Sequence, residues 1–166
     1  MKNIIYILLL LFNIDAYCQE WIDYNVIISV NEEVVPSSVG IKFKLTLNNG
    51  EKKIIEPHYL PGSLKIKSED VKVLKNDSIK EIALEIEYSS ICKEKISYSY
   101  FIIDDLSFKK FEHSYFILYI YDTRLKKYKK YYNPIEYKNF TYEYDSPNGS
   151  MRRVQKKFTR KQLNCK

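Results

Sequence analysis

The chain has 166 residues, of which 45% are hydrophobic and 29% charged, and its net charge is +6. This length fits one domain with a sizeable core, and the four Gly and five Pro leave no low-complexity linker, which argues against a multidomain chain. The charge is uneven, because residues 123–166 carry a net charge of +10 and residues 1–122 one of −4. Such asymmetry can mark an acidic partner, but the codon usage of an AT-rich genome enriches Lys without any ligand and is the preferred explanation.

The chain begins with the pattern of a secretory signal peptide. A positive charge precedes an apolar run over residues 4–11, which is shorter than the about 20 residues that a transmembrane helix needs. Cleavage after Cys18 would leave Gln19 as the mature N-terminus. We therefore predict a cleaved signal peptide over residues 1–18, no membrane span, and a single exported domain over residues 19–166, located in the periplasm or outside the cell.

The three cysteines bear on lipidation and on disulfide formation. Cys18 could accept a lipid, but Tyr17 and Asp15 stand where lipidation favours a small and an aliphatic residue. The abrupt change of polarity at Asp15 also argues against the alternative that the apolar run is a buried element of the fold. An oxidising compartment favours a disulfide between the two remaining cysteines, Cys92 and Cys165. The alternative is a buried Cys92 and a free thiol on a loose tail.

Apolar residues recur at every second position along most of the chain, which is typical of half-buried strands. In chain order this period predicts strands over residues 21–30, 39–47, 51–56, 81–88, 96–103, 114–122, 124–132 and 139–145, with one or two more within 64–75. Turn signals separate them, including Asn-Asn-Gly at 48–50 and a loop over 57–63 that contains Pro-Gly. The last segment is ambiguous, because Met151, Val154 and Phe158 are spaced like one face of a helix. We favour a hairpin strand to about residue 157, followed by a tail.

Three of these strands carry more specific expectations. The 114–122 strand is apolar on both faces and is predicted to be central in its sheet. The 124–132 strand is rich in Lys, which is typical of a sheet edge. In the 96–103 strand, the side chains expected to face the core are Ile96, Tyr98, Tyr100 and Ile102.

Eight to ten short strands separated by turns indicate an all-β fold, an antiparallel β-sandwich or barrel. We favour an immunoglobulin-like sandwich. The Cys–Trp–Cys order of true immunoglobulin domains is absent, because Trp21 precedes both mature cysteines.

Residue types that carry catalysis are scarce in the sequence. It has two histidines, His58 and His113, no zinc-ligand spacing and no phosphate-binding glycine loop, so we predict neither a metal nor a cofactor. A small enzyme could combine the 57–63 loop with Asp104, Asp105 and His113. The two aspartates fit an ordinary turn equally well.

Residues 121–144 stand out because they hold seven Tyr and six Lys or Arg. Aromatic rings and positive charges together suit an anionic polymer. Export argues against nucleic acid, so an anionic glycan or another envelope component is the expected ligand. Cross-strand tyrosine pairing on a charged edge is the structural alternative. The predicted contact residues are Arg124, Lys126, Lys127, Tyr128, Lys129, Lys130 and Tyr131.

These observations favour an exported, non-catalytic binding module that recognises a protein or an anionic envelope polymer. A periplasmic inhibitor or immunity-type protein is one alternative, because such proteins bind by shape and charge and need no motif. A small enzyme is the other.

Overall fold

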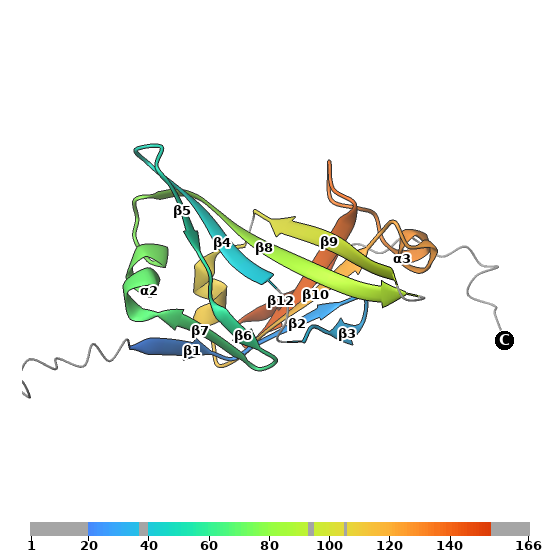
Figure 1. The fold of residues 1–166 in the computed structure, drawn as a ribbon, viewed down its shortest axis with the longest axis horizontal. Coiled ribbons are helices and arrows are strands. Elements are labelled where there is room, and N and C mark those ends of the chain that lie inside the picture. Colours follow the sequence, from blue (N-terminus) through green and yellow to red (C-terminus); the bar gives the residue numbers. More distant parts are fainter. Residues whose placement is uncertain (1–19, 37–39, 93–94, 105, 154–166) are drawn as a thin grey trace, which may run out of the picture.

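The computed structural model describes residues 20–36, 40–92, 95–104 and 106–153, and the chain is mostly β-structure with several antiparallel sheets (Figure 1). This confirms the all-β prediction in its coarse form. The predicted signal peptide, Cys165 and the C-terminal tail lie outside the described residues. Among the described residues, no helix is long and apolar enough to cross a membrane.

The first predicted strand is in fact two strands that belong to two sheets. β1 (Trp21–Tyr24) joins β7 (Ser63–Lys67) and β6 (His58–Leu60) in a three-stranded sheet of order β1-β7-β6. β2 (Val26–Val30) continues into another sheet. The alternation survives the break at Asn25, because apolar side chains on both sides of it are buried.

The loop predicted over 57–63 is wrong, since this segment forms the hairpin of β6 and β7. Three-residue strands such as β6 are too short to show a period. The predicted turn at its tip is present, and Gly62 there has a φ of +88°, which a residue without a Cβ adopts most readily.

A five-stranded sheet has the order β12-β11-β10-β2-β3. The strand over 114–122 appears as β10 (Phe116–Asp122) and is central in the sheet, as predicted. It pairs with β11 (Phe140–Ser146) antiparallel and with β2 in parallel. Two short strands, β3 (Glu33–Val34) and β12 (Gly149–Met151), complete the sheet.

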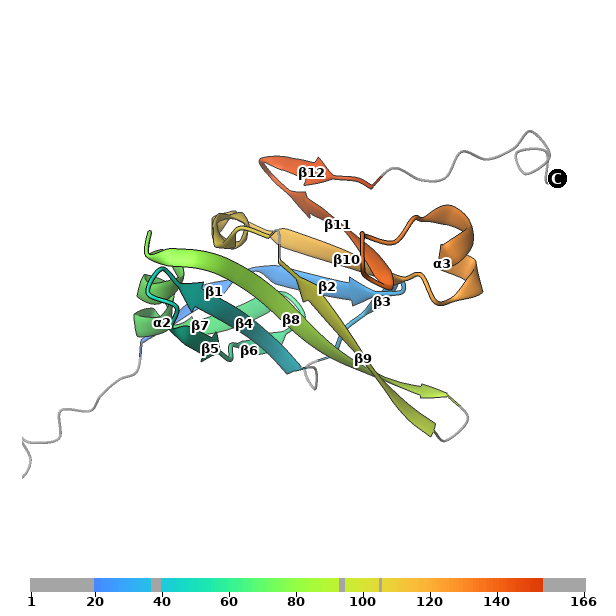
Figure 2. The ribbon, with the colours of Figure 1, turned by 90° about the horizontal axis from the view of Figure 1, so that it is seen from above.

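A four-stranded sheet of order β5-β4-β8-β9 packs against the five-stranded one, and Figure 2 shows the two as layers. It consists of β5 (Lys52–Ile55), β4 (Gly40–Leu47), β8 (Ile79–Cys92) and β9 (Lys95–Ile103). Aromatic rings join the layers: the Phe101 and Phe140 rings lie 5.2 Å apart, and Phe111 contacts both Phe43 and Phe116.

Two predicted strands are helical instead. The 71–74 stretch belongs to α2 (Ser68–Leu74), because Val71 and Leu74 bury one face at a spacing of three and acidic residues occupy the first turn. Residues 124–132 contain α3 (Lys126–Tyr131). There, Tyr128 and Tyr132 are buried at a spacing of four, which suits a helix, and strand alternation was the wrong period. A short 3-10 helix, η1 (Phe108–Glu112), precedes β10.

The face predicted for β9 is also wrong. Phe101 and Ile103 point into the core, opposite Ile86 and Leu84 of β8. The register with β8 decides the orientation, because a strand paired with a half-buried neighbour must turn the same face inward. The side chains expected inside therefore lie outside.

Candidate binding surfaces

The residues predicted to bind a ligand lie on α3 and in the turn before it. Four lysines of α3 are exposed: Lys126, Lys127, Lys129 and Lys130. Tyr128 is buried, and its hydroxyl donates a 2.8 Å hydrogen bond to the carbonyl oxygen of Asn31. The predicted strand over 124–132 would have turned alternate residues to opposite faces, and the helix does not place Lys and Tyr side chains in that way. The buried ring of Tyr128 is not available for stacking with a ligand.

Part of the positive charge near α3 is balanced locally. Arg124 makes a two-pronged contact with Asp122, which is buried, and its Nη2 also donates to Ser99 Oγ at 2.8 Å. Lys127 forms an ion pair with Glu32, and this hydrogen bond raises the pKa of Lys127. Lys130 instead lies over the ring of Tyr131. The surface is basic, but Arg124 and Lys127, two of its five cations, are held by carboxylates.

The residues of the hypothetical enzyme site are not brought together by any described contact. Asp104 binds Lys138 at 2.5 Å, and this hydrogen bond holds the pKa of Asp104 below its usual value. His113 lies within 3.3 Å of Asn148 Nδ2. Asp105 lies outside the described residues. His58 is located elsewhere, beside Trp21. Within the described part of the chain, no cluster of His, Cys, Asp and Glu could hold a metal.

Sequence reasoning missed a stripe of apolar side chains on the outer face of β9, which we call the β9 stripe. Ile96, Tyr98 and Tyr100 are each 58% exposed, and Ile102 is 39% exposed. The signal was present in the sequence, since residues 100–103 are apolar or aromatic without interruption and so cannot all face one core. β9 is the last strand of its sheet, and it pairs with β8 alone in the described sheets.

The free edge of β9 is only partly covered. Lys138 Nζ donates a 2.7 Å hydrogen bond to the carbonyl oxygen of Ile102. A cavity of about 350 Å³ lies along this edge, between Tyr100 and Ile102 on one side and Arg124, Tyr137 and Lys138 on the other. Figure 2 shows that the far half of the β8–β9 hairpin extends beyond the neighbouring strands.

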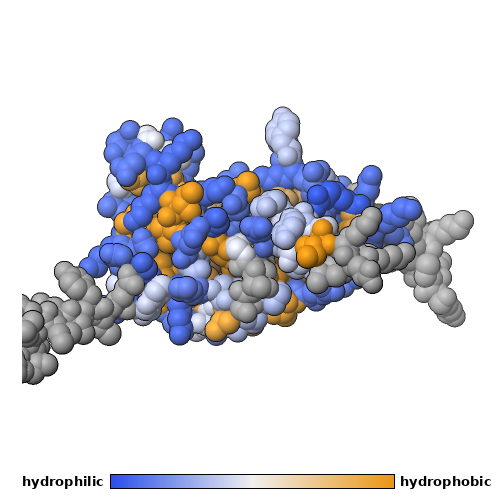
Figure 3. Space-filling view, in the orientation of Figure 1, coloured by the Kyte–Doolittle hydropathy of each residue, from blue (hydrophilic) through white to orange (hydrophobic). Residues whose placement is uncertain are grey.

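A larger hollow lies where the outer faces of the three-stranded and four-stranded sheets meet, and we call it the Trp21 hollow. Its volume is about 840 Å³, and its lining includes Trp21, His58, Gly40 and Glu87. Figure 3 shows this side of the molecule, where the largest apolar patch lies over β5 and beside α2, surrounded by hydrophilic residues. Ile54 of β5, which is 57% exposed, lines the hollow.

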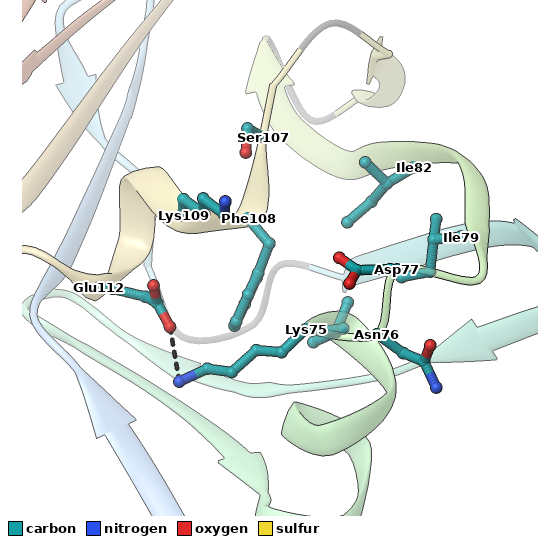
Figure 4. A pocket seen from close by; sticks show the side chains of 10 residues that line it. Lys75, Asn76, Asp77, Ile79, Ile82, Ser107, Phe108, Lys109 and Glu112 are labelled. Atoms are coloured by element: carbon teal, nitrogen blue, oxygen red, sulfur yellow. Dashed lines mark ion pairs between the residues drawn. The ribbon is translucent and has the colours of Figure 1, made fainter.

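A third cavity, of about 310 Å³, lies between the end of α2, the start of β8 and η1 (Figure 4). Ile82 and Phe108 point into it, and Lys75 reaches across one side to Glu112 at 2.5 Å. The hydrogen bond with Glu112 raises the pKa of Lys75. The apolar floor belongs to the seam along which α2 and η1 pack on the core, so we assign this cavity a packing role.

The comparisons with known proteins give no functional assignment. No family model, no curated protein and no solved structure matches the chain. The immunoglobulin-like form of the predicted sandwich is therefore not confirmed by any fold match.

Proposed function

We propose that this protein is an exported, non-catalytic module that binds an extended segment of another protein through the β9 stripe and the free edge of β9. The observation that carries the proposal is the exposure of four large side chains in a row on one strand. The signal-peptide pattern supports export, and the scarcity of catalytic residue types in the sequence supports a non-catalytic role. The immunoglobulin-like arrangement stays a prediction.

Contiguous exposed apolar patches mark interaction sites, and Tyr is enriched among the residues that dominate binding energy. In the β9 stripe two tyrosines stand between two isoleucines, so a partner would meet aromatic anchors at the centre of the patch. An edge strand also offers unpaired backbone groups. A segment that pairs with β9 gains main-chain hydrogen bonds, and its alternate side chains pack beside the β9 stripe.

The charges around β9 favour a partner segment of mixed polarity. Glu85 and Glu87 stand opposite Ile102 and Tyr100 on β8. On the far side of the edge, Arg124 and Lys138 line the cavity along β9. Both cations are already paired, Arg124 with Asp122 and Lys138 with Asp104, and Lys138 also bonds the carbonyl oxygen of Ile102. A segment that adds to β9 therefore suits apolar side chains beside the β9 stripe and polar ones toward these ion pairs.

A second candidate function is binding of an anionic envelope polymer by the exposed lysines of α3. The net charge of +10 over residues 123–166 supports it, because such a field attracts anions. Burial of Tyr128 leaves this surface without the aromatic platform that the prediction relied on. We therefore place it second.

Site-specific photo-cross-linking tests the proposal. A photoreactive phenylalanine analogue replaces Tyr98 of the β9 stripe in one variant and Tyr115, an exposed tyrosine between η1 and β10, in the control. In the envelope of the producing cell we expect a discrete cross-link to one other protein from position 98 alone, which the double variant Ile96→Lys, Tyr100→Lys abolishes. A cross-link to a second copy, or equal cross-linking from both positions, would refute the proposal.

A further inference from the structure

We propose that the Trp21 hollow is a binding site for a neutral carbohydrate. This site goes beyond the proposed protein contact, since it is built from other residues and takes another class of ligand. Its volume of about 840 Å³ falls in the range of roughly 300–1,000 Å³ that is typical of small-molecule sites.

Trp21 supplies the aromatic surface. Its ring is held on the outer face of β1 because the alternate residues Ile22 and Tyr24 face the core. The ring lies 4.9 Å from that of His58, tilted by 56°, and the residue stays 36% exposed. An indole held in this way at the mouth of a hollow presents an apolar ring with a polar edge. The C–H-rich face of a pyranose ring fits such a surface.

Charged groups around the ring supply hydrogen-bond partners for hydroxyl groups. Lys42 pairs with Glu56 at 3.0 Å, and Asp70 pairs with Lys53 at 3.0 Å, so their charges are already balanced. The remaining lining charges, on Lys67 and Glu87, are also opposite in sign. A balanced set attracts neither anions nor cations over long range, but each carboxylate still accepts strong hydrogen bonds from hydroxyl groups. This argues for a neutral, polyhydroxylated ligand.

Gly40 keeps the floor of the hollow open beside Glu87. The two residues are partners across β4 and β8. A Cβ at position 40 would lie 3.3 Å from both Glu87 Cβ and Glu87 Oε2, which is tighter than ordinary packing. Tyr100 donates a 3.3 Å hydrogen bond to the other carboxylate oxygen, Oε1, and so helps to orient the group. The glycine thus leaves room for a carboxylate to face a ligand that stacks on Trp21.

The protein carries its own reporter, because Trp21 is its one tryptophan. The experiment titrates the purified protein with cellotetraose and with tetra-N-acetylchitotetraose, and follows tryptophan emission. We expect a saturable change with at least one of these neutral oligosaccharides and little dependence on salt. An oligogalacturonate of the same length serves as the anionic probe, and we expect no saturable change with it.

Variants of two residues that line the Trp21 hollow, Glu87 and Trp21, show whether the sugar binds there. We expect Glu87→Gln to weaken binding about tenfold or more, as the loss of a charge-assisted hydrogen bond predicts. Trp21→Ala, followed by calorimetry, should abolish binding. The double variant Ile96→Lys, Tyr100→Lys disrupts the β9 stripe and tests the protein contact, so the matched control here is Tyr98→Ser, which should bind sugar normally. No saturable response to either neutral probe, a response to the anionic probe alone, or unchanged affinity in Trp21→Ala would overturn the inference.

Discussion

Tyr59 joins the three-stranded sheet to the five-stranded one through a single buried hydrogen bond, and replacing it with Phe should destabilise the fold. Its hydroxyl oxygen accepts the backbone N–H of Ile28 at 2.9 Å. Tyr59 is 5% exposed and Ile28 is 1% exposed, so water does not reach the pair freely. Tyr59→Phe removes the acceptor and keeps the ring, and it leaves a buried donor without a partner.

An orphaned buried donor costs about 1–3 kcal/mol. For a domain of this size each kcal/mol lowers Tm by about 2–4 °C, so we expect a loss of about 2–12 °C. Urea unfolding followed by circular dichroism gives the free energy directly, and an unchanged m-value would show that the compactness of the two states is unaltered. The control is Tyr115→Phe at an exposed site. A loss of less than about 0.5 kcal/mol, the usual scatter for surface substitutions, would refute the reasoning.

Four further outcomes are expected. Burial is the main cause of a raised pKa in Tyr24, Tyr59 and Tyr121, so above pH 10.0 the folded state holds phenolic protons that the unfolded state releases. The contribution of these tyrosines to stability is therefore complete below pH 10.0, the ordinary pKa of tyrosine, and is lost as the pH rises further. A tyrosinate absorbance titration in which every phenol of the folded protein ionises near its ordinary pKa would contradict this. On an immobilised anionic polymer, the wild type should elute at higher salt than a variant with the four α3 lysines changed to Glu, and equal elution would show that α3 is only a solubilising surface. Intact mass of the exported protein should place the N-terminus at Gln19, whereas a diacylglyceryl mass on Cys18 would disprove simple cleavage. Non-reducing peptide mapping should recover Cys92 linked to Cys165, and free thiols on both in protein purified without reductant would exclude the disulfide.

Strands with one solvent-exposed face could be predicted from the sequence, because burial of the other face places apolar residues at every second position. β4 is the clearest case: Ile41, Phe43 and Leu45 are buried, as the alternation predicts. The short helices α2 and α3 could not be predicted in this way. α2 buries Val71 and Leu74, and α3 buries Tyr128 with Tyr132 directly after its end. Over seven or fewer residues, so few buried positions do not distinguish a helix from a strand.

The candidate sites depend on pairings that no local pattern contains. The Trp21 hollow unites Trp21 of β1 with Gly40 of β4 and Glu87 of β8, and only the strand registers bring them together. The β9 stripe was visible as a run with too many apolar residues. Which face of β9 points into the core depends on its pairing with Leu84 and Ile86 of β8. The local sequence of β9 does not contain this pairing, so the wrong face was predicted.

Comparison of two strands of one sheet supports a functional origin for the β9 stripe. β4 turns Lys42, Lys44 and Thr46 outward and buries apolar residues inward, so the outer face of this strand is polar. β9 buries Phe101 and Ile103 in the same core, and polar residues on its outer face would serve the fold equally well. An apolar face on an edge strand carries a risk of aggregation. The fold does not need the exposed isoleucines and tyrosines, and their position at an edge is costly, which is the combination expected where a surface is kept for binding a partner.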